Sequence, residues 1–169
     1  MKRLNNCLKG KKYDGYPIWF MRQAGRYLPE FRTIRKNNPN FINLCLNEKL
    51  SAKISLQPLK RYDLDAAIIF SDILMIPYGL GQKIYFKKNF GPVLGNLDID
   101  SILKIKKKNF IEKLHNVYKG IELLKKTMDY KNKSLIGFSG SPWTLFVYML
   151  CQQSPKKNLY INPSRIGKI

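Results

Sequence analysis

Residues 64–70 read Leu-Asp-Ala-Ala-Ile-Ile-Phe, the stretch that most directly decides the fold. The run is short, and it is apolar throughout except for Asp65 near its start. A run of this kind is typical of a strand that is buried on both faces, as in a parallel sheet covered by helices. We therefore predict a buried parallel strand here.

Two further runs are predicted to be strands, at residues 16–21 and 134–139. Helical patterns separate the three runs, and alternating strands and helices favour an α/β fold with a parallel sheet. The distinctive polar residues follow the carboxyl ends of these strands, which is where (β/α)₈ barrels build their active sites. Residues 78–93, with three glycines and several lysines, are interpreted as a long excursion after the second strand.

Three helices are expected between and after these strands. Asn40 can cap a helix from residue 41 to about residue 61, with apolar residues at four-residue spacing on one face. A second amphipathic helix is expected from about residue 110 to residue 128. Ser141 and Pro142 have the pattern of an N-cap and a first helical residue, so a third helix is expected there.

The composition describes a folded and strongly basic chain. The 169 residues are 44% hydrophobic, and the formal net charge is +20 with a pI near 10.0. Such a charge is usual for proteins that bind nucleic acid. The lysines are scattered, however, and the chain is also rich in Asn and Ile, which indicates a compositional bias. A basic nucleic-acid-binding protein is therefore kept only as an alternative, and no nucleic-acid partner is expected.

The cysteines and the single histidine give no recognisable metal site. Cys7, Cys45 and Cys151 lie far apart with no Cys-x-x-Cys pair, so neither a zinc site nor a disulfide framework is predicted. The first nine residues are too polar for a signal peptide, and no apolar run approaches about 18 residues. We expect no metal, no membrane association and a cytoplasmic location.

An arginine-rich stretch lies at residues 17–32, where Arg22 and Arg26 stand four apart with Gly25 between them. Guanidinium groups grip carboxylates through paired donors, which an ammonium group cannot do. The glycine allows the backbone to come close to a ligand, because it has no Cβ. The stretch predicts a site for a polyanionic ligand; the alternative is a surface segment with solvated arginines.

The same stretch is the first of three ordered motifs. Residues 19–30, with Trp-x-Met followed by Arg-Gln-Ala-Gly-Arg-Tyr-Leu-Pro-Glu, resemble the N-terminal signature of uroporphyrinogen decarboxylase. Residues 70–77, with Phe-Ser-Asp-Ile-Leu and a later Ile-Pro, match the second motif of that family. Residues 137–149 match its third motif. The motifs cover most of residues 13–150, so the chain resembles the N-terminal half of the family.

The resemblance implies the N-terminal half of a (β/α)₈ TIM-type barrel, with parallel strands and alternating helices. Residues 1–169 would then be a single partial barrel domain whose C-terminal half is absent, since such a barrel needs about 250 residues. Half a barrel leaves open sheet edges and exposed apolar faces. We therefore expect this chain alone to fold poorly and to have little activity.

The implied activity is that of a lyase of porphyrin and heme biosynthesis. The family removes four acetate carboxyls from uroporphyrinogen III, giving coproporphyrinogen III, without cofactor or metal. Asp72 would be the catalytic residue, accepting N–H bonds from the pyrroles and stabilising a cationic transition state. The residues that would contact substrate are Arg22, Gln23, Ala24, Gly25, Arg26, Asp72 and Tyr148.

Alternatives stay open at several points. From local sequence alone Asp72 could cap a helix, and Tyr148 could be a core residue. The chain could also be an inactive remnant, or a related corrinoid or thiol methyltransferase, whose zinc site would lie in the absent half. The family implies a homodimer, and the length of the chain leaves open a second chain that supplies the missing half. Tyr78 and the pair Gln82-Lys83 depart from the family pattern.

Overall fold

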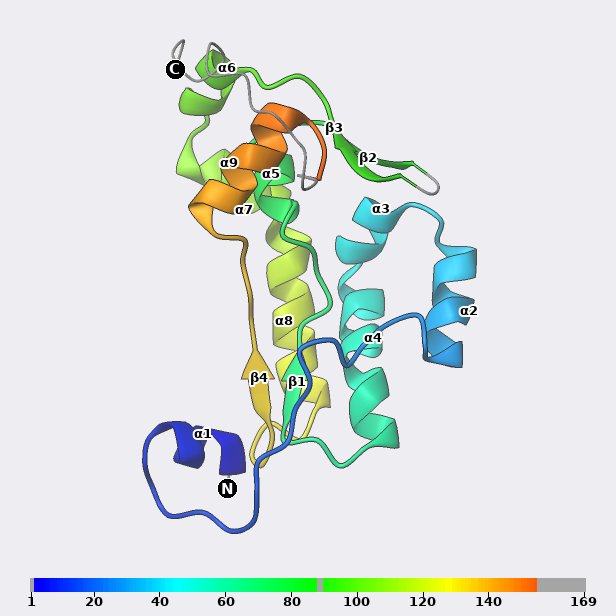
Figure 1. Cartoon of the computed structure of the whole chain (residues 1–169), viewed down its shortest axis with the longest axis vertical. Helices are drawn as coiled ribbons and strands as arrows, with labels where there is room; N and C mark the ends of the chain where they lie inside the picture. Colours follow the sequence, from blue (N-terminus) through cyan, green and yellow to red (C-terminus); the bar gives the residue numbers. More distant parts are fainter. Residues whose placement is uncertain (1, 88–89, 155–169) are drawn as a thin grey trace. The chain divides into compact units, whose positions relative to one another are not determined.

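The computed structural model describes residues 2–87 and 90–154 (Figure 1). The described chain forms two compact units. The first contains residues 2–72 and 115–138, and the second contains the remaining described residues, from 73 to 114 and from 139 to 154. Each unit has its own buried apolar cluster, so each is described separately.

The first unit is built around two parallel strands. Strand β1 (Ala66–Ile68) pairs with β4 (Ser134–Ile136), and Ala66 lies opposite Ser134 (Figure 1). Ala66 and Ala67 are fully buried, as expected for a strand covered on both faces. The predicted parallel pair is confirmed, although both strands are only three residues long.

Helices α4 (Glu48–Arg61) and α8 (His115–Thr127) pack against each other and against the β1 strand. Their shared core consists of Ala52, Ala67, Ile69, Leu124 and Met128. The helices approach closely at Gly120, where a Cβ would lie 3.5 Å from the Ser51 Oγ atom. Further polar contacts join α4 to the strand end: Ser51 Oγ donates to Phe70 O at 2.6 Å, and Phe70 N donates to Ser55 Oγ at 2.7 Å.

The predicted helix over residues 41–61 is two helices, α3 (Phe41–Cys45) and α4. Asn40 caps α3 as expected, accepting from Asn43 N at 3.0 Å. The chain then breaks at Leu46, because the Asn47 side chain accepts from Leu50 N at 3.0 Å and starts a new helix.

The predicted helix over residues 110–128 is also divided. Helix α7 (Lys107–Lys113) belongs to the second unit and α8 to the first, so the break at Leu114 coincides with the boundary between the units.

The predicted strand at residues 16–21 is wrong: no strand forms there. Ile18 O accepts from Asp65 N at 2.8 Å, but Ile18 N donates to the Asp65 carboxylate at 2.7 Å. A side-chain oxygen thus takes the donor that a strand ladder would have used. The segment runs beside the start of β1 without becoming part of the sheet.

Two short helices complete the first unit. Helix α1 (Arg3–Leu8) is tied to the sheet by Arg3, which lies 3.2 Å from the Asp65 carboxylate. Helix α2 (Pro29–Asn37) begins at a proline and buries Phe31 and Ile34. These two side chains pack with residues from α3 and α4 in a second apolar cluster.

The second unit contains helices and an antiparallel hairpin. The hairpin strands are β2 (Ile84–Lys87) and β3 (Gly91–Leu94), so the predicted excursion after β1 has regular structure. Helices α5 (Met75–Gly79) and α6 (Ile99–Leu103) flank it in sequence. Leu74, Leu94 and Met149 form the buried cluster of this unit.

Helix α9 (Pro142–Cys151) confirms the expected third helix. Ser141 is its N-cap, with Oγ accepting from Thr144 N at 3.3 Å, and Pro142 is its first residue. Within residues 2–87 and 90–154, no helix combines the length and apolarity that a membrane crossing requires.

Candidate functional site

A buried glutamine holds the arginine-rich segment against β1. Gln23 is 3% exposed, and its Oε1 atom accepts from Phe20 N at 3.2 Å. Its Nε2 atom donates to Ala66 O at 2.8 Å. A buried amide that bonds at both ends fixes the backbone on either side of it. We call this arrangement the Gln23 clamp.

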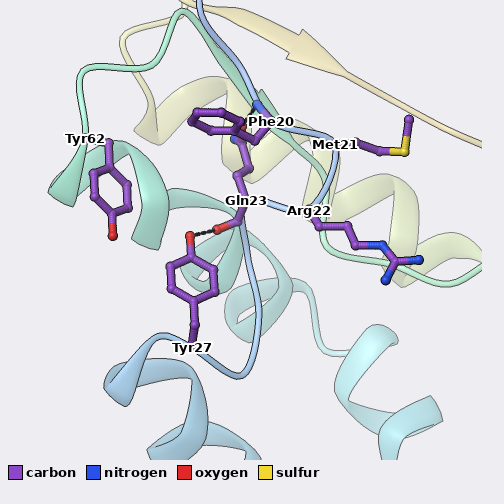
Figure 2. A pocket seen from close by; sticks show the side chains of 6 residues that line it. All are labelled: Phe20, Met21, Arg22, Gln23, Tyr27 and Tyr62. Atoms are coloured by element: carbon purple, nitrogen blue, oxygen red, sulfur yellow. Dashed lines mark hydrogen bonds between the residues drawn. The ribbon is translucent and has the colours of Figure 1, made fainter.

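Tyr27 also fixes the backbone of this loop at Gln23. Its hydroxyl donates to the main-chain oxygen of Gln23, as Figure 2 shows. Burial raises the pKa of Tyr27, and the neighbouring Tyr62 raises it further. The hydroxyl therefore remains a proton donor at neutral pH.

The two arginines of the segment are exposed. Figure 2 shows the Arg22 guanidinium pointing away from Tyr27 and Tyr62. The Arg26 main-chain oxygen accepts from Arg32 Nη1 at 3.0 Å, which holds the backbone beside it. Among the described residues, neither Arg22 nor Arg26 is in an ion pair. Both guanidinium groups are therefore available to an anionic ligand.

A cavity of about 200 Å³ lies where these residues meet the carboxyl end of β1. It is lined by residues 21–24, residues 68–71 and Phe138, which follows β4. Arg22, Gln23 and Ala24 are thus brought to the strand ends, as the sequence predicts. The opening of a parallel sheet at its carboxyl ends is the usual place for a ligand in α/β folds.

Asp72 follows Ser71 at the edge of this cavity without itself lining it, and its side chain is half-buried. It is not the N-cap of α5: that position is Leu74, which makes no side-chain cap bond. The pKa of the nearby Cys45 thiol is raised to about 12, chiefly by burial and also by the negative charge of Asp72. Asp72 is therefore close to α3 in the first unit.

A second cavity of about 590 Å³ also borders the clamp (Figure 2). Aromatic and aliphatic side chains dominate its lining, which consists of Phe20, Met21, Arg22, Gln23, Tyr27 and Tyr62. Phe20 is 59% and Met21 80% exposed. Large apolar side chains exposed together usually mark a surface that contacts something else.

The remaining predicted site residues are less constrained. Gly25 has no positive φ, and a Cβ there would meet no atom within 4 Å, so the fold itself does not require glycine. Tyr148 lies in the second unit and packs against its apolar cluster, while its hydroxyl is 3.1 Å from Ser154 Oγ. The other six predicted site residues belong to the first unit.

Sequence reasoning missed the structural roles of two residues that build the site. Gln23 was predicted as a substrate contact and not as the clamp that its side chain forms. Asp65 has no role in the motifs, yet its carboxylate bonds Ile18 N and Arg3. The signal for Asp65 was a charged residue inside a buried run, because such a residue is rarely buried without partners.

No metal site is apparent in the described part of the chain. No group of three or more His, Cys, Asp or Glu side chains there could hold a metal ion. The thiols of Cys7, Cys45 and Cys151 form no disulfide.

Comparison with known proteins decides the family. The sequence model of the family described as Uroporphyrinogen decarboxylase (URO-D) matches residues 1–167. The chain belongs to this family. A uroporphyrinogen decarboxylase from Rickettsia canadensis is 48% identical over 150 residues, which is 89% of this chain and 44% of that protein. One from Campylobacter jejuni is 44% identical, over 98% of this chain and 51% of its own length.

The chain therefore spans about half the length of the curated uroporphyrinogen decarboxylases that it matches, and the resemblance seen in its motifs is confirmed. Among solved structures, a methyltransferase from Methanosarcina mazei superimposes with a TM-score of 0.64. The match covers 87% of this chain and 44% of the methyltransferase, at 17% sequence identity. That likeness shows a shared fold.

Proposed function

We propose that this chain supplies the arginine- and aspartate-bearing half of a uroporphyrinogen decarboxylase. The reaction removes four acetate carboxyls of uroporphyrinogen III as carbon dioxide and gives coproporphyrinogen III. The observation that carries the proposal is the Gln23 clamp, which holds Arg22 beside the carboxyl end of β1. Asp72 leaves the same strand end one residue after the cavity lining.

The substrate carries eight carboxylates, so binding it requires cations with directed donors. Arg22 and Arg26 provide two guanidinium forks on a loop whose backbone is fixed at Gln23 and Tyr27. Charge-assisted pairs of this kind are about twice as strong as neutral hydrogen bonds. The backbone of Gln23, Ala24 and Gly25 supplies further contacts, and the absence of a Cβ at Gly25 leaves room for the ligand.

Asp72 supplies the anion that the chemistry needs. Breaking the bond to the carboxylate leaves an electron pair on carbon, and a pyrrole that is protonated on carbon accepts that pair. The cationic ring is stabilised by a fixed carboxylate that accepts from the pyrrole N–H groups. Because the substrate provides its own electron sink, the family reaction needs neither cofactor nor metal. Tyr148 would then bond the substrate near the reacting side chain.

The half-barrel architecture is part of the proposal. The parallel β1–β4 pair, the family and the coverage of about half of each relative support the N-terminal half of a (β/α)₈ barrel, with residues 1–169 as one partial domain. Ile18, Phe20 and Met21 are 48%, 59% and 80% exposed beside β1, which suits a face that a second half covers. That half would lie on a separate chain or on a longer one. The complete enzyme is proposed to be a homodimer in the cytoplasm.

The test is a fused protein. The matched 150 residues of this chain are joined to the part of the Rickettsia canadensis relative that lies beyond the match. We expect the fused protein to convert uroporphyrinogen III to coproporphyrinogen III, measured by chromatography of the oxidised products. The isolated chain should give no product and no cooperative thermal transition. A folded fused protein without turnover would contradict the proposed function.

A further inference from the structure

The second unit contains a separate cavity of about 340 Å³ that has no part in the proposed reaction. The turn between α5 and β2 forms one side, and the end of α7 contributes a lysine. Two lysines, two tyrosines and a glutamine stand among its lining residues, which are Tyr78, Gly81, Gln82, Lys83, Ile84, Tyr85 and Lys113.

The turn brings one lysine close to the backbone. Gly81 has a φ of +85°, and its N–H donates to Tyr78 O at 2.9 Å. A side chain at this position would be strained. A Cβ at position 81 would lie 3.4 Å from the Lys113 Nζ atom. The positive φ therefore requires glycine at this turn, and the Lys113 ammonium lies next to it.

Gln82 lines this cavity and has an unused acceptor. Its side chain is 5% exposed, and Nε2 donates to Gly95 O at 2.8 Å and to Met149 O at 3.1 Å. These two carbonyls accept only, so they fix which end of the amide is nitrogen. The Oε1 atom is buried and accepts from no donor in the described part of the chain. A buried acceptor of this kind is unfavourable until a donor reaches it.

The charges at the cavity favour an anionic ligand. Neither Lys83 nor Lys113 is in an ion pair with a carboxylate within the described ranges. Two ammonium groups and the hydroxyls of Tyr78 and Tyr85 are all donors, while Gln82 Oε1 needs one. A ligand that satisfies both demands has anionic oxygens and a hydroxyl. An ionised carboxylate group alone has acceptors only, whereas hydrogenphosphate keeps one P–OH donor.

We infer that this cavity binds phosphate, as the inorganic ion or as an ester that carries a hydroxyl group. The lysine pair neutralises the charge, and Gln82 Oε1 accepts from the hydroxyl.

The experiment titrates the ¹⁵N-labelled fused protein with inorganic phosphate in a buffer that is otherwise phosphate-free and neutral, following the Gly81 and Gly95 amides. Sulfate is the matched probe, because it has a similar shape and charge but no hydroxyl. We expect saturable shifts with phosphate and about tenfold weaker binding of sulfate, a ratio that corresponds to one hydrogen bond of about 1.4 kcal/mol.

Two variants and a control identify the residues. The double variant Lys83→Met/Lys113→Met should lose phosphate binding by about tenfold or more. Gln82→Met should remove the preference for phosphate over sulfate. Lys49→Met/Lys126→Met, which changes the charge equally at exposed sites of the first unit, should bind as the unaltered chain does.

Equal losses in both lysine double variants would overturn the inference, since the attraction would then come from net charge. Equal affinity for phosphate and sulfate would overturn the role of Gln82. Absence of shifts would overturn the site as a whole. Random-coil shifts at Gly81 and Gly95 would do so as well, because the turn that forms the cavity would not exist.

Discussion

Two loops of this molecule are each held by one buried glutamine, and they differ in a single atom. In the first unit, Gln23 donates to the backbone of β1 and also accepts from Phe20 N. In the second unit, Gln82 donates to two backbone carbonyls, but its Oε1 atom has no donor among the described residues.

The difference separates a positioning residue from one that can receive a ligand. Gln23 has satisfied both ends of its amide, so its part is to hold the segment that carries Arg22 and Arg26. Gln82 holds its turn with one end only, and two lysines line the same cavity. Buried polar groups are nearly always paired, so an unpaired one in a charged cavity indicates a binding site.

The largest effect is expected at Asp72 in the fused protein. Asp72→Asn removes the carboxylate that stabilises the cationic ring, so kcat should fall about a hundredfold or more. Exposed Asp100 provides the matched control, and Asp100→Asn should leave turnover unchanged. Turnover by Asp72→Asn equal to that of the control would place catalysis elsewhere than at the strand end beside the Gln23 clamp.

Replacing each glutamine by methionine compares the two loops directly. Gln23→Met leaves Ala66 O without a partner in a buried place and Phe20 N without one in a partly buried place, which should cost about 2–4 kcal/mol of unfolding free energy. Gln82→Met also loses two bonds but removes the unpaired oxygen, so about 1 kcal/mol is expected. Urea unfolding of the fused protein measures both. A larger loss for Gln82→Met would reverse the comparison.

Two glycines sharpen the comparison further. A Cβ at Gly79 would lie 2.6 Å from a ring carbon of Phe110, so Gly79→Ala should cost about 1–2 kcal/mol in the second unit. Gly25→Ala meets open space and should change stability by less than about 0.5 kcal/mol. It should nevertheless raise KM for uroporphyrinogen, because the new methyl group would occupy ligand space. An unchanged KM would remove Gly25 from the site.

The smallest effect is expected at the surface of the first unit. Arg61 donates to both oxygens of Glu30, at 2.6 and 2.9 Å, and lowers the pKa of that carboxyl to about 2. Because the Glu30 pKa is lower in the folded state, the ionised carboxylate stabilises the fold at pH values above its unfolded pKa, near 4.5. That contribution is lost as the pH falls towards 2. In the fused protein, we compare the thermal midpoints of the unaltered sequence and of the Glu30→Gln variant. The difference between them should shrink over that pH range. A constant difference would show that the ion pair contributes nothing.

The sequence predicted the parts of the fold that short local patterns determine. The apolar run around β1, its partner β4 and the Ser141 cap all depend on residues next to one another, and all are confirmed. The family followed from motifs of the same kind.

The errors came from contacts between distant residues and, at Asn47, from a local signal that was overlooked. The segment at 16–21 has the composition of a strand, but the Asp65 carboxylate takes the Ile18 donor and prevents a ladder. Asn47 could have been recognised as a second cap, since it precedes Glu48 and an apolar repeat. The Gln23 and Gln82 side-chain bonds span 43 and 67 residues, and no local pattern encodes them.

The most direct test of the account is the contribution of the paired arginines to catalysis. In the fused protein, Arg22→Met/Arg26→Met should lower kcat/KM for uroporphyrinogen III by about a hundredfold or more, since two charge-assisted contacts are lost. Lys49→Met/Lys126→Met removes the same charge and should change kcat/KM less than about twofold. Equal effects of the two double variants would contradict the claim that the loop held by Gln23 binds the substrate.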